Sequence, residues 1–331
     1  MSKVKILDCT LRDGGYINDW IFGQAAIKDI LDNNTKLGVD IIETGYLRDV
    51  QDDINSTIYS SPVQFERIVK QKSPDIIYAV MIEMACYFPY EKITQRNENT
   101  FDLIRYTFWK RCLDEGFEYC KKIREKGYEL GVQPTRVEQY SENDFKEMIL
   151  RFSELEPYAL YIVDTFGLLN KDMLKKYADI ANRYLPPNIS LGYHAHNNMQ
   201  QALDNAAALV ELNFDRDIIL DVSAFGMGRG AGNLNSEIFL NYLNQQYGME
   251  YDISQVYEIW DKWLKDIYDK KKWGYNMHYL ISAYYKANPN FADYFLDNKI
   301  SVGDANRIMQ SIPYEDRIIF SEDKIRKYME R

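Results

Sequence analysis

Histidine and cysteine are scarce in this sequence, with three and four copies among 331 residues. The cysteines (Cys9, Cys86, Cys112 and Cys120) form no CxxC pair, and we expect free thiols in a cytoplasmic protein. Two of the three histidines stand one residue apart, which makes their position informative.

Long apolar runs and an excess of positive charge are also missing. No run reaches the length of about 18 apolar residues that a membrane span needs. The formal net charge of −10 argues against a nucleic-acid or anionic membrane partner. The first seven residues lack the apolar core of a signal peptide and favour a strand. The remaining composition, 46% hydrophobic and 27% charged, is that of a globular protein.

Short apolar, β-branched runs recur along the chain, with helical patterns between them. The predicted strands are residues 4–9, 39–43, 76–82, 103–108, 129–133, 159–164, 190–196 and 218–223. Strands alternating with helices are typical of βαβ units and a parallel sheet. Eight such units predict an α/β fold, the (β/α)8 TIM barrel.

Helical patterns connect these runs at residues 25–31 and 199–212. After about residue 245 only helical patterns follow, at residues 251–269 and 279–287. In the first of these, Trp260, Trp263 and Ile267 form an apolar stripe. The sequence therefore predicts a catalytic barrel of residues 1–245 and a helical C-terminal extension of residues 246–331.

Polar residues stand at or just beyond the C-terminal ends of the predicted strands. They are Asp13, Glu43, Glu83, Arg105, Gln133, Asp164, His194 and His196. Because barrel active sites are built on this rim, we predict that the functional site lies there.

The segment Gly192-Tyr193-His194-Ala195-His196-Asn197 carries the strongest pattern. Residues i and i+2 of a strand point to the same face, so His194 and His196 would present two imidazoles side by side. Asp13, in Leu11-Arg12-Asp13-Gly14, would add a carboxylate. Such a set suits a divalent cation with open positions and indicates a metal-dependent enzyme. The alternative is one buried, hydrogen-bonded histidine and one exposed histidine.

Three neighbours of this set have two interpretations each. Arg12 could stabilise an enolate through its planar fork of donors, or form a rim salt bridge to Glu43. A glycine-rich loop, residues 224–233, could bring its backbone close to an anion, and Gly228 lies within it. Asn233 could be a further oxygen ligand, or cap a helix that begins near Leu234.

Thr165, in Asp164-Thr165-Phe166-Gly167, could donate to a substrate carboxylate or cap a helix. Cys9 lacks a base partner, so core packing is its expected role. His278 is expected to be a structural histidine at the surface of the extension.

Together these segments resemble the DRE-TIM metallolyase superfamily of HMGL-like barrels. The superfamily includes 4-hydroxy-2-oxovalerate aldolase, hydroxymethylglutaryl-CoA lyase, and the isopropylmalate, citramalate and homocitrate synthases. The resembling segments are residues 8–14, 42–45, 164–167, 194–198 and 226–233. They lie in the family's order, and the aldolase branch, with its helical extension, is the most similar.

The resemblance implies a divalent metal, Mn2+ or Mg2+ with Co2+ as a third candidate, held by Asp13, His194 and His196. Asn233 is predicted as an added ligand. The resemblance also implies that Arg12 steadies a pyruvate-like enolate while a carbon–carbon bond is made or broken beside a 2-oxo acid. Substrate contacts are predicted for Arg12, Glu43, Gln133, Thr165 and Gly228.

One position departs from the aldolases, which carry a histidine three residues after the metal-binding aspartate as the base for the substrate hydroxyl. This chain has Tyr16 there, and an ordinary tyrosine pKa near 10 makes it a poorer base. Either the base lies elsewhere, or the metal tunes Tyr16, or the reaction is not a simple aldol cleavage. A tyrosine of the extension works near the aldolase site, and Tyr279 is the first candidate for it and Tyr275 the second.

The leading hypothesis is a metal-dependent aldolase or lyase acting on pyruvate and an aldehyde. A Claisen-type acyl-CoA synthase or lyase of the same superfamily is the second, and a barrel without catalysis is the third. The resemblance also implies a homo-oligomer and an aldehyde dehydrogenase subunit that contacts the extension.

Overall fold

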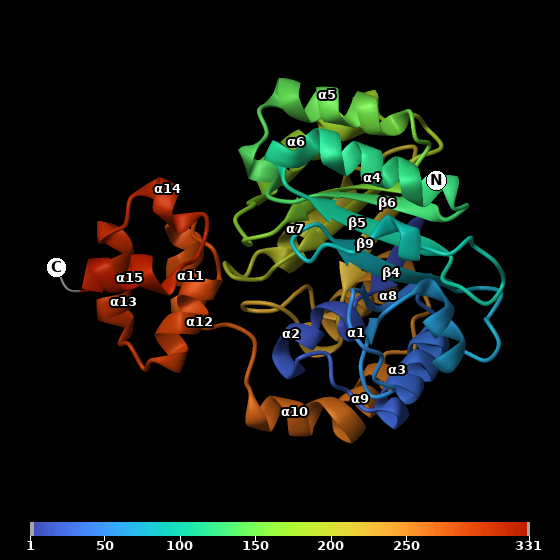
Figure 1. Cartoon of the computed structure of the whole chain (residues 1–331), viewed down its shortest axis with the longest axis horizontal. Coiled ribbons are helices and arrows are strands. Elements are labelled where there is room, and N and C mark those ends of the chain that lie inside the picture. The colour runs from blue at the N-terminus through green and yellow to red at the C-terminus, as the bar shows by residue number, and fades with distance from the viewer. Residues whose placement is uncertain (1–2, 330–331) are drawn as a thin grey trace.

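A closed barrel of parallel strands forms the larger part of the molecule (Figure 1). The computed structural model describes residues 3–329. The barrel strands are β1 (Val4–Asp8), β2 (Ile41–Leu47), β4 (Ile77–Glu83), β5 (Leu103–Phe108), β6 (Glu129–Pro134), β7 (Ala159–Asp164), β8 (Ser190–Ala195) and β9 (Ile218–Val222). Strand β1 pairs with both β2 and β9, which closes the barrel and confirms the predicted fold class.

All eight predicted strands are present, and β5 and β7 coincide with their predicted residues. The strands are nearly continuous apolar runs because side chains inside and outside the barrel are both buried. One short strand, β3 (Ile58–Tyr59), was not predicted, and it pairs with β2 beyond the irregularity between Glu43 and Tyr46.

Six α-helices cover the outside of the barrel. They are α3 (Gln24–Leu37), α4 (Leu113–Glu125), α5 (Glu142–Ser153), α6 (Lys171–Tyr184), α7 (Ala202–Glu211) and α8 (Ser236–Tyr247). Two one-turn helices, α1 (Thr10–Asp13) and α2 (Gly15–Asn18), follow β1.

The expectation of a helix after every strand is wrong after β2 and β4. Short 3-10 helices, Pro62–Arg67 and Tyr90–Lys92, occupy these connections. Each connection contains a proline, which cannot donate a backbone hydrogen bond inside an α-helix. Phe65 takes over the covering role, since it is buried against Tyr78 and Phe101 at centroid distances of 5.2 and 5.0 Å.

The first part of the C-terminal region packs on the barrel. Helices α9 (Ser254–Ile259) and α10 (Lys265–Lys270) flank a π-helical turn, Trp260–Leu264, and α9 lies against α3. The single helix predicted over residues 251–269 therefore begins later and is interrupted. Asn244 explains the late start, because its side chain binds both the N–H and the C=O of Tyr251.

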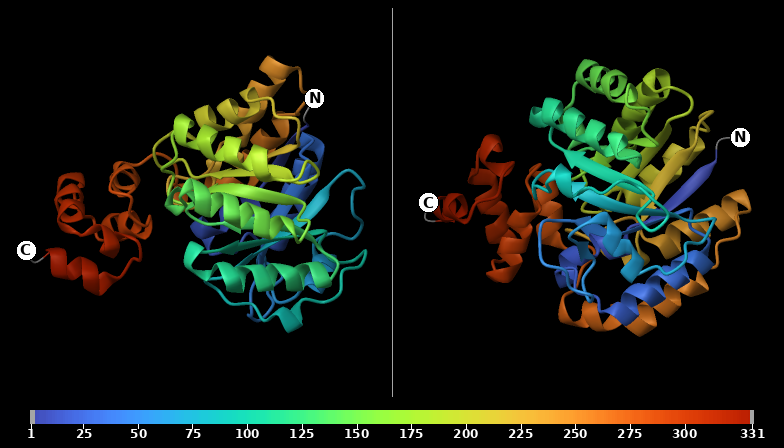
Figure 2. Two further views of the ribbon diagram at one scale, coloured as in Figure 1. Left: turned by 90° about the horizontal axis from the view of Figure 1, so that it is seen from above. Right: turned by 45° about the vertical axis from the view of Figure 1, so that its right-hand side comes forward.

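The last five helices form a smaller lobe beside the barrel (Figures 1 and 2). They are α11 (Met277–Tyr284), α12 (Asn290–Asp297), α13 (Val302–Ser311), α14 (Tyr314–Arg317) and α15 (Glu322–Met329). The lobe has its own apolar cluster, which includes Phe291, Phe295 and Met309. Helix α8 crosses the predicted boundary at residue 245, so the change between the two hydrophobic cores falls later, between α10 and α11.

Nothing in the described part of the chain, residues 3–329, forms a helix with the length and hydropathy of a membrane span.

We predict that Phe65→Ala lowers the free energy of unfolding by about 3–5 kcal/mol, because it opens a cavity where no helix covers the barrel. Urea unfolding followed by circular dichroism measures the loss. Val63→Ala is the control, since Val63 belongs to the same 3-10 helix but is exposed. Equal effects of the two substitutions would contradict the covering role of Phe65.

Candidate metal centre and active site

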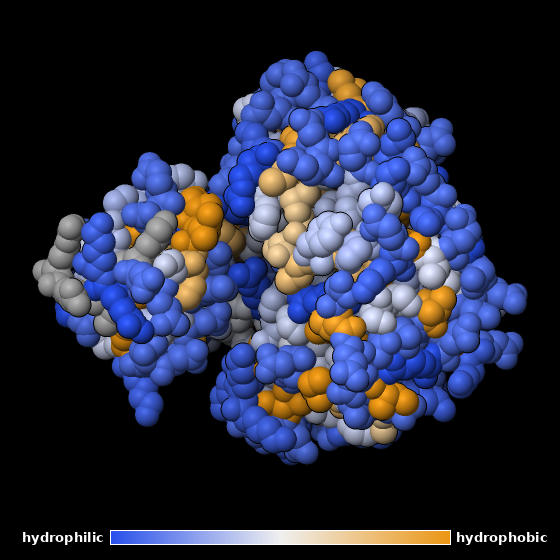
Figure 3. All heavy atoms as spheres, viewed as in Figure 1, coloured by the Kyte–Doolittle hydropathy of each residue, from blue (hydrophilic) through white to orange (hydrophobic). Residues whose placement is uncertain are grey.

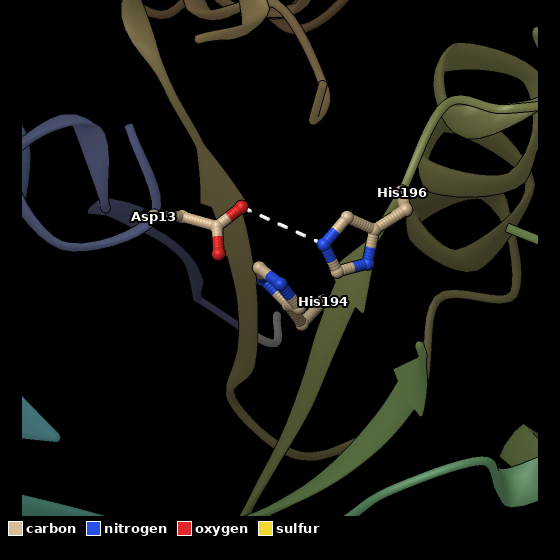
Figure 4. Close-up of side chains that lie close together, drawn as sticks. All are labelled: Asp13, His194 and His196. Carbon is tan, nitrogen blue, oxygen red and sulfur yellow. Dashed lines mark ion pairs between the residues drawn. The ribbon is translucent and has the colours of Figure 1, made fainter. Parts of the chain in front are cut away.

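Asp13, His194 and His196 converge at one end of the barrel (Figure 4). Asp13 ends α1, His194 lies in β8, and His196 follows β8 directly. All three side chains are buried, and one ligand atom of each lies within 4.8 Å of the others. Tertiary structure thus brings Asp13 to two histidines that lie 181 and 183 positions further along the chain, as the sequence pattern predicts.

The two imidazoles are held by their Nδ1 atoms. Nδ1 of His194 lies 2.9 Å from Oδ2 of Asp221, and Nδ1 of His196 lies 3.2 Å from the carbonyl oxygen of Asp164. A carbonyl can only accept, so the His196 Nδ1 carries the proton and its Nε2 is free to act as a ligand. That Nε2 is buried without a hydrogen-bond partner, 3.5 Å from Oδ2 of Asp13.

Local charge acts on the pKa of Asp13, and burial acts on that of His194. Burial opposes ionisation of Asp13, but Arg12 and the two histidines overcome this effect and hold the pKa of Asp13 well below its usual range. Burial lowers the pKa of His194, although Asp221 opposes this change. A carboxylate and a neutral imidazole are the forms that bind a metal ion.

Asn233 completes the set with an unpartnered oxygen. Its Nδ2 donates to the Met227 carbonyl at 3.2 Å, and its buried Oδ1 has no partner. The capping alternative is wrong, because α8 begins at Ser236, with Asn235 at its N-cap position. Two imidazole nitrogens, a carboxylate and a free amide oxygen fit a divalent cation with open positions.

Arg12 forms the predicted rim salt bridge to Glu43 and also pairs with Asp13. Its Nε donates to Glu43 at 2.6 Å, which is the rim salt bridge, and its Nη1 donates to Asp13 at 2.5 Å. Its buried Nη2 has no partner and is the donor left for a substrate oxygen.

Glu43 and Gln133 lie inside the barrel, where both contact Arg105 rather than a cavity. Glu43 is fully buried and forms ion pairs with Arg12 and, at 2.8 Å, with Arg105. With its amide turned to satisfy its neighbours, the Gln133 oxygen accepts from Nε and Nη2 of Arg105 at 2.9 and 2.8 Å. This geometry gives both residues a supporting role instead of the predicted substrate contact.

Asp221 is a functional residue that the sequence interpretation missed. It pairs with Arg105 and with the ring of His194, so it connects the interior ion pairs to a candidate ligand. The sequence feature that could have indicated this role is that Asp221 is the one acidic residue in the apolar strand Ile218–Val222.

The glycine-rich loop closes over the candidate metal centre. The backbone N–H of Arg229 lies 3.4 Å from Oδ2 of Asp13. A Cβ at Gly228 would lie 2.3 Å from Nδ2 of Asn233 and 2.6 Å from Oδ2 of Asp13, so no larger residue fits. Gly228 therefore lies at the predicted position, against two candidate ligands.

Two cavities lie between the strand ends and the C-terminal lobe, next to the glycine-rich loop. The larger has a volume of about 690 Å³ and is lined by the ends of β4 to β7 and by Asn288 and Ile318 of the lobe. The smaller, about 300 Å³, is lined by Tyr16, Tyr279 and Asp293 among others. Glu83 and Arg229 line both cavities. Figure 3 shows the groove between the lobe and the barrel.

Thr165 lines the larger cavity, but its hydroxyl already accepts from the backbone N–H of Arg136 at 2.8 Å. The capping alternative is wrong, because α6 begins at Lys171 and Asn170 caps it. The Thr165 hydroxyl retains its proton for a substrate oxygen.

The three candidate tyrosines differ in position. Tyr16 and Tyr279 both face the smaller cavity, whereas Tyr275 is 56% exposed and does not line it. The Tyr16 hydroxyl lies 3.2 Å from that of Tyr46, and burial raises the pKa of Tyr16 to about 12. The Tyr279 hydroxyl donates to Asp293 at 2.5 Å, and burial raises the pKa of Tyr279.

Two other predictions concern residues outside the centre. Cys9 is buried and donates to the Val222 carbonyl, and burial raises its pKa well above the usual value, which agrees with a packing role. His278 is structural but buried, not at the surface, because its ring contacts Asn276 and the Ile300 carbonyl.

The fold and the site define a (β/α)8 barrel with a candidate divalent-metal centre at its C-terminal rim. Residues 109–262 match the HMGL-like family model. This match covers less than half of the chain and agrees with the resemblance of its sequence segments to the DRE-TIM superfamily.

Curated relatives are similar over short segments. The chain is 33% identical over 82 residues to the 4-hydroxy-2-oxovalerate aldolase of Polaromonas naphthalenivorans, covering 25% of this chain and 23% of the relative. It is 31% identical over 101 residues to 4-hydroxy-2-oxovalerate aldolase 3 of Comamonas testosteroni, covering 30% and 28%. These matches span about a quarter of each relative's length.

Solved structures share the fold over most of the chain. The N-terminal domain of a provisionally named aldolase from Bacteroides vulgatus has a TM-score of 0.73 at 24% identity, covering 91% of this chain and 98% of that one. The carboxyl transferase domain of Rhizobium etli pyruvate carboxylase with pyruvate has a TM-score of 0.71 at 13% identity, covering 99% and 60%. At these identities the similarity establishes the fold alone.

We predict that Gly228→Ala weakens Mn2+ binding by about 10- to 100-fold, the usual effect of disturbing the surroundings of metal ligands. The added methyl group would displace Asp13 and Asn233. Isothermal titration with Mn2+ measures the affinity. Gly303→Ala is the control, because a Cβ at this position in helix α13 would meet no atom within 4 Å. This variant should bind Mn2+ as the unmodified protein does. Unchanged binding by Gly228→Ala would place the ion elsewhere.

Proposed function

We propose that this protein is a divalent-metal-dependent lyase of the 4-hydroxy-2-oxo acid aldolase type, which cleaves or forms a carbon–carbon bond beside pyruvate. The observation that carries the proposal is the buried set of Asp13, His194 and His196 next to Arg12, in which Nε2 of His196 has no hydrogen-bond partner among the described residues. The names of the curated relatives support the same reaction type.

Asp13, His194, His196 and Asn233 would hold the ion, for which Mn2+ and Mg2+ are the first candidates and Co2+ the third. When bound, such an ion supplies a Lewis acid for the 2-oxo carbonyl group. The buried network around the set has three carboxylates (Asp13, Glu43 and Asp221) and two guanidinium groups (Arg12 and Arg105). With a divalent cation its net charge becomes positive, which suits an anionic 2-oxo acid.

Arg12 would stabilise the charge that develops on the substrate. Its Nη2 donor is unoccupied, while Glu43 and Asp13 fix the other guanidinium nitrogens in the buried site. A donor fixed in a dry site stabilises an enolate oxygen without a cost of reorganisation. Thr165 and the backbone around Gly228 would orient the substrate carboxylate.

In cleavage, the C4 hydroxyl loses its proton and the C3–C4 bond breaks. The bond's electron pair passes to the enolate of pyruvate, which takes a proton at C3, and the aldehyde leaves. No oxidant or reductant is consumed.

Tyr16 would act in this reaction as a neutral donor rather than as a base. With its pKa raised to about 12, the phenol keeps its proton at neutral pH and donates a hydrogen bond to the aldehyde oxygen. Glu83 lines both cavities and is the carboxylate that we place as proton acceptor. Tyr279, held by Asp293, would close the site from the lobe.

An aldehyde dehydrogenase partner and a homo-oligomer stay predictions that rest on the resemblance to the aldolases.

The proposed activity predicts Mn2+-dependent release of pyruvate from 4-hydroxy-2-oxovalerate. A coupled assay that reduces the released pyruvate to lactate measures the rate. Treatment with EDTA should abolish turnover, and added Mn2+ should restore it. Asp13→Asn should lower kcat/KM by about 10- to 100-fold or more, because a ligand loses its charge. Turnover that survives EDTA would overturn the metal's role. Release of free thiol from acetyl-CoA with a 2-oxo acid, without aldolase turnover, would favour the Claisen-type reaction.

Replacing the cavity tyrosines should affect catalysis more than folding. We expect Tyr16→Phe to lower kcat by about 100-fold or more, since it removes a hydrogen-bond donor from the oxygen that becomes the aldehyde oxygen. Tyr279→Phe should have a smaller effect, because Tyr279 already donates to Asp293. Tyr275→Phe, which changes an exposed tyrosine outside the cavity, is the matched control. Steady-state kinetics separates the three, and a fully active Tyr16→Phe would exclude Tyr16 as the donor.

A further inference from the structure

The larger cavity is rich in cations although the chain as a whole is acidic. Lys110, Arg111, Arg136 and Arg229 line it, and Glu83 is the one carboxylate among its described lining residues. The whole chain, by contrast, has a formal net charge of −10. Such a local excess of positive charge attracts anions.

Two of these cations are neutralised by carboxylates behind the cavity wall. Lys110 pairs with Asp144 at 2.6 Å, and Arg136 pairs with Glu138 at 2.8 Å. The cavity carboxylate Glu83 is itself within 3.5 Å of Arg48. These pairs leave Arg111 and Arg229.

Arg111 and Arg229 have no carboxylate within ion-pair distance among the residues that the structure describes. Arg111 stacks on the ring of Trp109, 4.4 Å from its centroid. Arg229 donates to the amide oxygens of Asn288 and Asn290 in the C-terminal lobe, at 3.2 and 2.7 Å. Neither guanidinium group is held in an ion pair among the described residues, although Asp293 acts on Arg229 through its charge. Carboxylate and phosphate groups are the anions that arginine binds best.

The Arg229 side chain points away from the candidate metal centre and contacts the C-terminal lobe. Its backbone N–H faces Asp13, but its guanidinium reaches Asn288 and Asn290. Pyruvate, held at the centre beside Arg12, would therefore not use this charge. An anionic group bound by Arg229 would therefore belong to the other reactant.

We propose that the second reactant is an aldehyde with an oxyanion group, a carboxylate or a phosphate, remote from its carbonyl carbon and bound by Arg229 and Arg111. This inference rests on the proposed function. In the synthetic direction, C3 of the pyruvate enolate bonds to the aldehyde carbon, and the aldehyde oxygen takes a proton. The remote anion takes no part in the bond change.

The test measures aldol synthesis from pyruvate with Mn2+ and four acceptors. Succinic semialdehyde carries a carboxylate and is matched by neutral butanal. Glyceraldehyde 3-phosphate carries a phosphate and is matched by neutral glyceraldehyde. We expect kcat/KM for at least one charged acceptor to exceed that of its neutral match by about 10-fold or more, the usual contribution of a charged hydrogen bond. A preference for succinic semialdehyde would identify the anion as a carboxylate, and a preference for glyceraldehyde 3-phosphate would identify it as a phosphate.

The variants assign the preference to residues. Arg229→Gln combined with Arg111→Gln should reduce the charged-to-neutral ratio to near one, and Arg229→Lys should keep part of it. Arg151→Gln is the control, because Arg151 pairs with Asp114 away from the cavity and should leave the ratio unchanged. NMR measures the exchange of the pyruvate methyl protons for deuterium. A variant that catalyses this exchange is folded and forms the enolate.

The same exchange separates the two proposals. Deuterium exchange with no preference for a charged acceptor overturns the anionic aldehyde and leaves the proposed function standing. A preference that survives in the double variant overturns the assignment to Arg229 and Arg111. Absence of both exchange and synthesis overturns the proposed function, and the anionic aldehyde with it.

Discussion

The buried charge of Arg105 connects the fold of this protein to its candidate active site. Arg105 is fully buried inside the barrel, paired with Glu43 and Asp221 and placed over the ring of Tyr161. Removing one partner of such a buried pair typically costs about 3–5 kcal/mol, because the charge left behind has no water to solvate it. Glu43 in turn fixes Arg12, and Asp221 fixes the ring of His194.

This arrangement explains why the site needs a closed barrel. Arg105 comes from β5, whereas its two carboxylates come from β2 and β9, on either side of β1. The strands hold these groups at fixed separations, so Arg12 and His194 are oriented before any substrate arrives. Preorganised donors of this kind stabilise developing charge more than mobile ones in water do.

The C-terminal lobe adds residues to the walls of the two cavities at the barrel rim. The barrel rim supplies the candidate ligands, and the lobe supplies Asn288, Asn290, Tyr279 and Asp293 around the space above them. The two parts meet through Arg229 and through the packing of Tyr279 against Ala231 of the glycine-rich loop. A substrate bound there would face the candidate metal ligands on one side and the lobe on the other.

The eight strands and the side-by-side placement of His194 and His196 could be predicted from the sequence, because alternation and short apolar runs are local properties. The sequence also predicted Asp13, since the residue follows the first strand. The contact of Asp221 with His194 and the contacts of Glu43 and Gln133 with Arg105 follow from the tertiary structure. So does the lack of ion pairs for Arg229 and Arg111 among the residues that the structure describes. Those outcomes depend on contacts between residues far apart in the chain, and on burial, which no local pattern records.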